Sequence, residues 1–126
     1  IDDAASKISA IKFVRRYADA LQRRLAENRN VVSDGRDSGS VVFKDADYKC
    51  YITASGEVRA QRWQMKQKQR GKNFTVQEAS TCIKDRDDRD QNRPVSPLII
   101  PQGAIVIENN GDNPEAVVQK ISSFFI

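Results

Sequence analysis

Residues 30–43 read NVVSDGRDSGSVVF, and this stretch points most directly to the fold of the chain. A short apolar run ends in Asp34, turns through Gly35 and then presents Arg36 and Asp37. A continuous β-branched run is typical of a buried parallel strand, and open α/β sheets bind their ligands where such strands end. The stretch therefore predicts an α/β fold with a candidate binding turn, although a tight turn with a surface ion pair would explain either charged residue alone.

The segments on either side of this turn predict several helices. Apolar residues recur at helical spacing over 2–28, which indicates one amphipathic helix or a bent pair of helices. Ser55 is a candidate N-cap for a helix that ends before Gly71. Thr75, with a glutamate three residues later, forms a capping box. Asn113 precedes a proline and an acid, which is typical of the start of a helix.

Strand-like runs lie between these helices. They are continuous and β-branched rather than alternating, as in sheets that are covered on both faces. The predicted strands are 30–33, 47–53 and 104–108. Because two predicted helices separate the last two strands, the β-α-α-β order predicts a parallel α/β sheet with right-handed crossovers.

A charged run at 84–93, KDRDDRDQNR, offers a second candidate site. It carries four charges of each sign, so it does not repel itself as a tail of one sign would. On a helix, one face would present Arg86, Arg89, Asp90 and Arg93, with three guanidinium groups around one carboxylate. Guanidinium groups grip phosphate and a carboxylate accepts from sugar hydroxyls, so this face suits a phosphorylated, hydroxylated small molecule. Taken alone, this run is explained more simply as a solvated helix end whose side chains form ion pairs.

The composition restricts the chemistry that the chain could perform. Its 126 residues form one domain or part of one, and 21 Lys and Arg against 17 Asp and Glu give a net charge of +4, which fits anionic ligands. With no histidine and two isolated cysteines, neither a zinc site nor a histidine-based triad is expected. Because the sequence contains no signal peptide or transmembrane run, we expect a cytoplasmic protein without a membrane partner.

Together these stretches resemble bacterial cytidylate kinases, which phosphorylate CMP. The resemblance covers nearly the whole chain and rests on segments that follow one another in the family's order. These segments are DAASKISA at 3–10, DGRDSGSVVF at 34–43, ITASGEVRA at 52–60 and RDDRDQNR at 86–93. The resemblance implies the α/β fold of a P-loop nucleoside monophosphate kinase, in which helices flank a parallel sheet.

The chain lacks the P-loop, Gly-x-x-x-x-Gly-Lys-Ser/Thr, that holds the ATP phosphates in this class. In the family this motif lies near the N-terminus, ahead of every segment present here. We therefore expect residues 1–126 to be the C-terminal portion of a single CMP kinase core, with a lid region at about 59–75 and with the N-terminal strands and P-loop absent from this chain. Without the P-loop region, we expect this portion to be inactive.

The resemblance also implies how CMP is recognised. Ser6 and Asp37 would face the exocyclic amino group of cytosine, and Arg15 would face its N3 and O2 acceptors. Uracil would set its O4 against Asp37, acceptor against acceptor, so the site would reject UMP. Arg36 and Arg93 would clamp the CMP phosphate as catalytic residues. Without the resemblance, the serine reads as a helix cap and the first arginine as part of a solvated helix face.

The remaining implied roles concern the ribose, ATP and the metal. Arg86 and Asp90 would bind the ribose. Arg59 and Arg62 would begin the lid and reach the ATP phosphates as it closes, and the second of them would also act in catalysis. Asp34 ends its predicted strand as a Walker-B-type acid would, so it is a candidate to hold Mg²⁺ through water, with a turn cap as the alternative.

The family implies CMP, dCMP and ATP as small-molecule partners and Mg²⁺ as a cofactor. The full-length enzyme is expected to be a monomer that binds no nucleic acid. The alternative is a noncatalytic domain that binds nucleotides or RNA through its arginine-rich helices, with a steep dependence on salt. The sequence favours the kinase, because the aspartates of the charged run would repel a continuous phosphate backbone.

Overall fold

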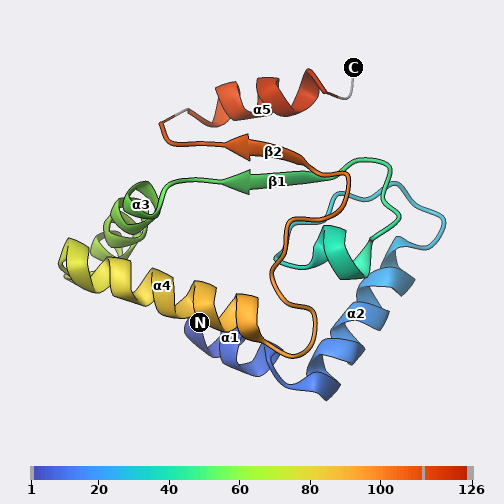
Figure 1. The fold of residues 1–126 in the computed structure, drawn as a ribbon, viewed down its shortest axis with the longest axis horizontal. Coiled ribbons are helices and arrows are strands. Elements are labelled where there is room, and N and C mark those ends of the chain that lie inside the picture. The colour runs from blue at the N-terminus through green and yellow to red at the C-terminus, as the bar shows by residue number, and fades with distance from the viewer. Residues whose placement is uncertain (1, 112, 125–126) are drawn as a thin grey trace. The chain divides into compact units, whose positions relative to one another are not determined.

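A computed structural model describes residues 2–111 and 113–124, except for the side chains of Asp2, Asp3 and Ser6 (Figure 1). The α-helices are α1 (Asp2–Ser9), α2 (Lys12–Ala26), α3 (Gly56–Gln69), α4 (Val76–Asn92) and α5 (Pro114–Ser122). A short π-helical turn, η1, covers Ser38–Val42, and the strands are β1 (Cys50–Thr53) and β2 (Ile105–Glu108). The chain divides into two compact units. Unit 1 comprises Ile1–Lys49 and Arg86–Ala104, and unit 2 comprises Cys50–Asp85 and Ile105–Ile126.

The first two helices form a bent pair, which confirms one of the two arrangements that the apolar spacing predicted. α1 ends at Ser9 and α2 begins at Lys12, and the amides of the connection bond back into the last turn of α1 at 3.0 and 3.2 Å. The buried residues of α2 are Arg15 and Asp19, whereas apolar residues such as Leu25 are largely exposed, in this case by 59%. This helix therefore buries charge rather than the apolar stripe that predicted it.

The strand predicted at 30–33 is wrong. These residues form an extended loop that leads into the turn at 34–37, and the side chain of Val32 is fully exposed. A strand forms where a neighbouring segment completes its hydrogen bonds. Among the described residues, the strand pairing joins β1 to β2 and does not include this segment. The turn is nevertheless present, and η1 follows it directly.

The other two predicted strands are confirmed in shorter form as β1 and β2 of unit 2. They pair in parallel along their whole length, which confirms the predicted α/β class. Ile107 is buried, but Ile52 and Val106 are 53% and 52% exposed. The prediction that both faces of the sheet are covered is therefore wrong for the described residues, where the sheet has two strands and few neighbours.

The helix caps lie where the sequence predicted them. Ser55 Oγ accepts from a backbone amide in the first turn of α3 at 3.3 Å, and Gly71 follows the end of that helix with φ +75°. Thr75 and Glu78 form a reciprocal capping box at the start of α4, with bonds of 2.7 and 3.2 Å. Asn113 Oδ1 accepts from an amide of α5 at 2.8 Å. These local bonds satisfy amides that would otherwise lack partners at each helix start.

In unit 2, aromatic packing connects α3 to the loop that follows it. The rings of Trp63 and Phe74 meet edge to face, with centroids 4.9 Å apart. Gln64 Nε2 donates to the carbonyl of Phe74 at 2.6 Å. The region predicted to be a lid therefore holds its own loop against its helix. No helix within the described ranges is both long enough and apolar enough to cross a membrane.

Candidate functional site

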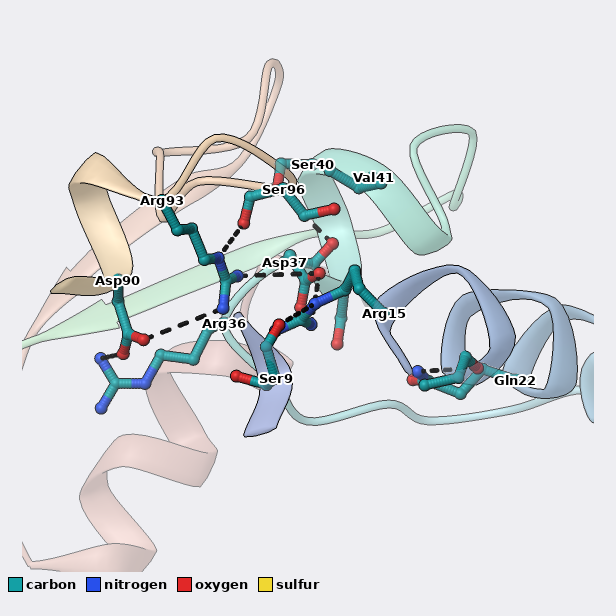
Figure 2. A network of polar contacts seen from close by, with 12 residues as sticks. Ser9, Arg15, Gln22, Arg36, Asp37, Ser40, Val41, Asp90, Arg93 and Ser96 are labelled. Carbon is teal, nitrogen blue, oxygen red and sulfur yellow. Dashed lines mark hydrogen bonds and ion pairs between the residues drawn. The ribbon is translucent and has the colours of Figure 1, made fainter. Parts of the chain in front are cut away.

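Charged side chains from separate parts of the sequence gather in unit 1 (Figure 2). Arg15 comes from α2, Arg36 and Asp37 come from the turn before η1, and Asp90 lies near the end of α4. Arg93 follows that helix directly. Positive and negative groups alternate through the resulting network of ion pairs. The fold therefore joins the two sequence stretches that were predicted separately as candidate sites.

Asp37 connects two of the arginines. Arg15 Nη1 donates a hydrogen bond to Asp37 Oδ2 at 2.8 Å, and Arg93 Nη2 lies 3.7 Å from the same oxygen. Arg15 is also oriented by its Nε, which donates to the carbonyl of Ser9 at 3.2 Å. Although Asp37 immediately precedes η1, its carboxylate does not cap that turn. The carboxylate is instead directed to the guanidinium groups, and both of its ion pairs use Oδ2.

Asp90 is the second anionic centre of the site. Arg36 Nη1 and Arg86 Nε lie 3.4 and 3.8 Å from its Oδ2, and Arg93 Nη1 lies 3.8 Å from its Oδ1. Arg36 Nη1 also lies 3.7 Å from Asp87 Oδ1. The side chain of Asp90 is only 4% exposed. The reading of this run as a solvated helix end is therefore wrong at this position.

The predicted grouping of three guanidinium groups around Asp90 is found in part: the ion pairs of Asp90 include two of the predicted arginines, and Arg36 stands where Arg89 was predicted. Arg36 joins Arg86 and Arg93 around Asp90, although it lies about 50 residues away in the sequence. The network contains four arginines and three aspartates, so it carries a net positive charge. Its members are Arg15, Arg36, Arg86 and Arg93 with Asp37, Asp87 and Asp90. This balance suits an anionic ligand.

The chain after α4 folds back to orient Arg93. Arg93 Nε donates to the carbonyl of Ser96, and the amide of Leu98 donates to the carbonyl of Asp90 at 2.8 Å. Ser96 is buried and has φ +52°, a left-handed conformation that costs a residue with a side chain on the order of 1 kcal/mol. The loop therefore accepts local strain while it fixes the direction of this guanidinium group.

Arg93 has unused hydrogen-bonding capacity in a buried position. Its Nη2 is buried and, among the described residues, has no hydrogen-bond partner. The 3.7 Å separation from Asp37 Oδ2 is too long for a hydrogen bond. Burial lowers the pKa of Arg93 from its usual value, and the charge of Arg15 adds to this effect, while Asp37 and Asp90 oppose it. The group stays charged at neutral pH, so a ligand oxygen near Nη2 would satisfy a donor whose desolvation costs about 1–3 kcal/mol.

Asp19 also belongs to this region, and sequence reasoning missed it. It is 7% exposed, and its Oδ1 has no hydrogen-bond partner within the described residues. Burial raises the pKa of Asp19, and the nearby charge of Asp37 raises it further, whereas Arg15, Arg23 and Arg93 lower it. Its position four residues after Arg15 places both on one face of α2, and that spacing could have indicated it.

The other predicted site residues are not part of this network as described. The side chain of Ser6 lies outside the described residues, so its contact with the base stays a prediction. Asp34 is exposed at the start of the turn. Arg59 and Arg62 belong to α3 in unit 2, where Arg62 Nη2 donates to Asn109 Oδ1 at 3.1 Å.

The described residues offer few ligands for a magnesium ion. Among the described side chains, no group of three or more His, Cys, Asp or Glu is arranged to hold a metal. Mg²⁺ keeps several water ligands and is commonly held by one or two carboxylates together with substrate phosphates. Asp34 offers a single exposed carboxylate. Such a group suits a contact through water to an ion whose main ligands are nucleotide phosphates.

Comparison with known proteins finds similar sequences over nearly the whole chain. A family model described as cytidylate kinase matches residues 1–125. A cytidylate kinase of Clostridium botulinum (strain Langeland) is 43% identical over 121 residues, which are 96% of this chain and 56% of that protein. Those of Caldanaerobacter subterraneus and Marinomonas sp. are 42% and 40% identical, again over 96% of this chain, and it covers 54% and 53% of them. The chain thus spans about half the length of these relatives.

Proposed function

Because this chain belongs to the cytidylate kinase family, we propose that it supplies the CMP site and the lid of an enzyme that transfers the γ-phosphoryl group of ATP to CMP or dCMP. The buried network that joins Arg15, Asp37, Arg93 and Asp90 is the observation that carries this proposal. The complete kinase, in this proposal, consists of this chain together with an upstream region that contains the P-loop.

In the proposed base site, Asp37 and Arg15 read the two hydrogen-bonding edges of cytosine. The ion pairs of Asp37 use Oδ2, so Oδ1 is the proposed acceptor for the exocyclic amino group. Arg15 is held beside it by the carbonyl of Ser9 and donates to N3 or O2. Uracil presents an acceptor where cytosine presents a donor, which sets Oδ1 of Asp37 against another acceptor and makes UMP a poor substrate.

In the proposed phosphate site, Arg36 and Arg93 hold the phosphate of CMP. The side chain of Arg36 is 33% exposed, and its ion pairs with Asp87 and Asp90 are long, at 3.7 and 3.4 Å, so little is lost when it turns to a ligand. The side chain of Arg93 is 4% exposed by contrast, is bonded to the carbonyl of Ser96 and offers the buried Nη2 donor. One partly exposed and one buried arginine together would position the phosphate for attack on ATP.

The remaining proposed roles concern the ribose, ATP and the metal ion. Asp90 accepts from the ribose hydroxyls, with Arg86 beside it as a partly exposed donor. Arg59 and Arg62 reach the ATP phosphates when the lid closes. Asp34 would hold a bound Mg²⁺ ion through water, and the ion would supply neutralisation of charge on the phosphates. The acids within the network argue against binding of a continuous RNA backbone, whose phosphates they would repel.

Base selectivity tests this proposal. The measurement is kcat/KM for CMP and for UMP with the complete kinase and with its Asp37→Ala variant. We expect the unsubstituted enzyme to prefer CMP strongly and Asp37→Ala to lose on the order of 100-fold in kcat/KM for CMP while the gap to UMP narrows. Asp45→Ala is the matched control, because that aspartate is 87% exposed and should leave both values unchanged. An unchanged CMP-to-UMP ratio in Asp37→Ala would show that this carboxylate does not read the base.

A further inference from the structure

Arg23 makes two bonds that the site described above does not explain. Its Nε donates to the carbonyl of Val42 at 3.0 Å, and its Nη2 donates to the carbonyl of Val41 at 2.8 Å. These carbonyls end η1, where a helical turn has no further amides of its own to satisfy them. The planar fork of a guanidinium group fits two neighbouring carbonyls, which an ammonium group cannot match with the same geometry. Arg23 therefore fastens the end of η1 to α2.

The two residues whose carbonyls accept from Arg23 are bonded to Asp37 through their own amides. The amides of Val41 and Val42 donate to the carbonyl of Asp37 at 2.9 and 3.2 Å. Asp37 thus precedes a turn whose last two residues are held at both their amides and their carbonyls. A shift of this turn along α2 would move the backbone of Asp37 with it.

The same helix also holds the other end of this segment. Arg15, eight residues before Arg23, bonds to the carboxylate of Asp37 at 2.8 Å (Figure 2). Residues eight apart fall within one broad side of a helix, so α2 presents two arginines to one short segment. Arg15 holds the side chain of Asp37, and Arg23 holds the backbone of the turn that follows it.

We propose that Arg23 is a positioning residue for base recognition, which keeps Asp37 in place while Arg15 turns from Asp37 to the cytosine ring. This inference rests on the proposed function. A ligand base competes with Asp37 for the donors of Arg15, so the bond between them weakens when CMP binds. The two bonds from Arg23 to the backbone use no atom that the base needs, so they persist through binding. Arg23 touches neither substrate nor reacting atoms in this account.

The next residue provides a matched control. Arg24 lies on the same helix, carries the same charge and is exposed. Among the described residues, the side chain of Arg24 makes no hydrogen bond or ion pair. Arg23→Met removes both donors while it keeps a long side chain, and Arg23→Lys keeps the charge but loses the fork. Arg24→Met removes one positive charge from the same helix.

The test is the ratio of kcat/KM for CMP to kcat/KM for UMP in the complete kinase and these variants. We expect Arg23→Met to lower the ratio about 10-fold, in the same direction as Asp37→Ala, because a displaced acceptor reads the base poorly. The ratio for Arg23→Lys should lie between that of Arg23→Met and that of the unsubstituted enzyme, and Arg24→Met should leave the ratio unchanged. In an Asp37→Ala background, Arg23→Met should lower the ratio no further, since both changes act through one carboxylate.

The ratio separates the possible outcomes. Partial unfolding of a variant lowers both kcat/KM values equally and leaves their ratio unchanged, so a merely structural role for Arg23 would appear as an unchanged ratio and would overturn the inference. An equal decrease of the CMP-to-UMP ratio in Arg23→Met and Arg24→Met would also overturn the inference, because the loss of charge alone would then explain the effect. If the unsubstituted enzyme shows no preference for CMP, the proposed function itself fails.

Discussion

At the scale of single residues, the site depends on charges that are buried and shared. Asp90 and Arg93 each have side chains that are only 4% exposed, and both contact more than one partner. Removal of one member of a buried ion pair leaves the other uncompensated, which is more destabilising than the pair is stabilising. Activities of variants in this network therefore need to be expressed per folded molecule.

The two proposed phosphate clamps should be the most sensitive arginines. We expect Arg36→Ala and Arg93→Ala to reduce turnover of CMP by the complete kinase about 100-fold or more, because positioning and charge stabilisation supply most of the catalysis in phosphoryl transfer. Arg89→Ala, a charge removal on the same helix as Asp90, should reduce turnover much less. Steady-state kinetics checks this, with the folded fraction measured by circular dichroism. Equal and mild losses in all three variants would mean that the charged run serves only as an ion-paired surface.

Asp19 predicts a dependence of stability on pH. Burial, with the charge of Asp37, raises its pKa in the folded state above the usual 3.8, against the opposing effect of Arg15, Arg23 and Arg93. The folded state therefore holds this proton more tightly than the unfolded state, so the contribution of Asp19 to stability falls as pH rises from about 3.8 through the raised pKa. Asp19→Asn removes this titration. Its Tm relative to the unsubstituted chain should rise with pH and then level off.

Thermal unfolding between pH 3.5 and pH 7 checks this expectation, with Asp45→Asn as the control because that side chain is 87% exposed. The control should show no comparable trend. A Tm difference for Asp19→Asn that instead shrinks as pH rises would mean that attraction to the three arginines outweighs burial.

At the scale of elements, the helices could be predicted well because their signals are local. The caps at Ser55, Thr75 and Asn113 each bond within the first turn of the helix they start, so the residues that decide the helix boundary are close in sequence. The break near Ser9 matches one of the two arrangements that the apolar spacing left open, the bent pair. Local pattern was less informative about burial, because Leu21 and Leu25 of the apolar stripe of α2 are exposed while Arg15 and Asp19 are buried.

The strands show the opposite case, because their formation depends on distant partners. β1 and β2 form where each has the other as a neighbour, whereas the run at 30–33, with its two valines, pairs with no strand among the described residues and stays a loop. β propensity alone could not separate these cases.

The candidate site was predictable in part for the same reason. Helical spacing places Arg86, Arg89, Asp90 and Arg93 on one face, and the structure pairs the first and last of these arginines with the aspartate. The contact of Arg36 with Asp90 crosses between two elements, and so do the bonds of Arg23 to η1. Such contacts follow from tertiary packing, which no spacing within one segment specifies.

At the scale of the whole molecule, the proposed functions divide between the two units. Unit 1 holds the network that we assign to CMP, and unit 2 holds α3, with the arginines that we assign to the ATP phosphates. The chain spans about half the length of the curated relatives it matches, and its sequence contains no P-loop. We therefore expect this chain to bind and select CMP, the phosphoryl acceptor, and an upstream region to bind the phosphates of ATP, the donor.

Formation of CDP from CMP and ATP tests this account most directly. The assay compares the purified 126-residue chain with a longer protein that also includes the residues encoded upstream of Ile1. We expect no CDP above background from the chain alone, because no P-loop backbone or lysine holds the β and γ phosphates, and rapid CDP formation from the longer protein. Robust CDP formation by the chain alone, or its absence from a longer protein that carries a P-loop, would contradict the account.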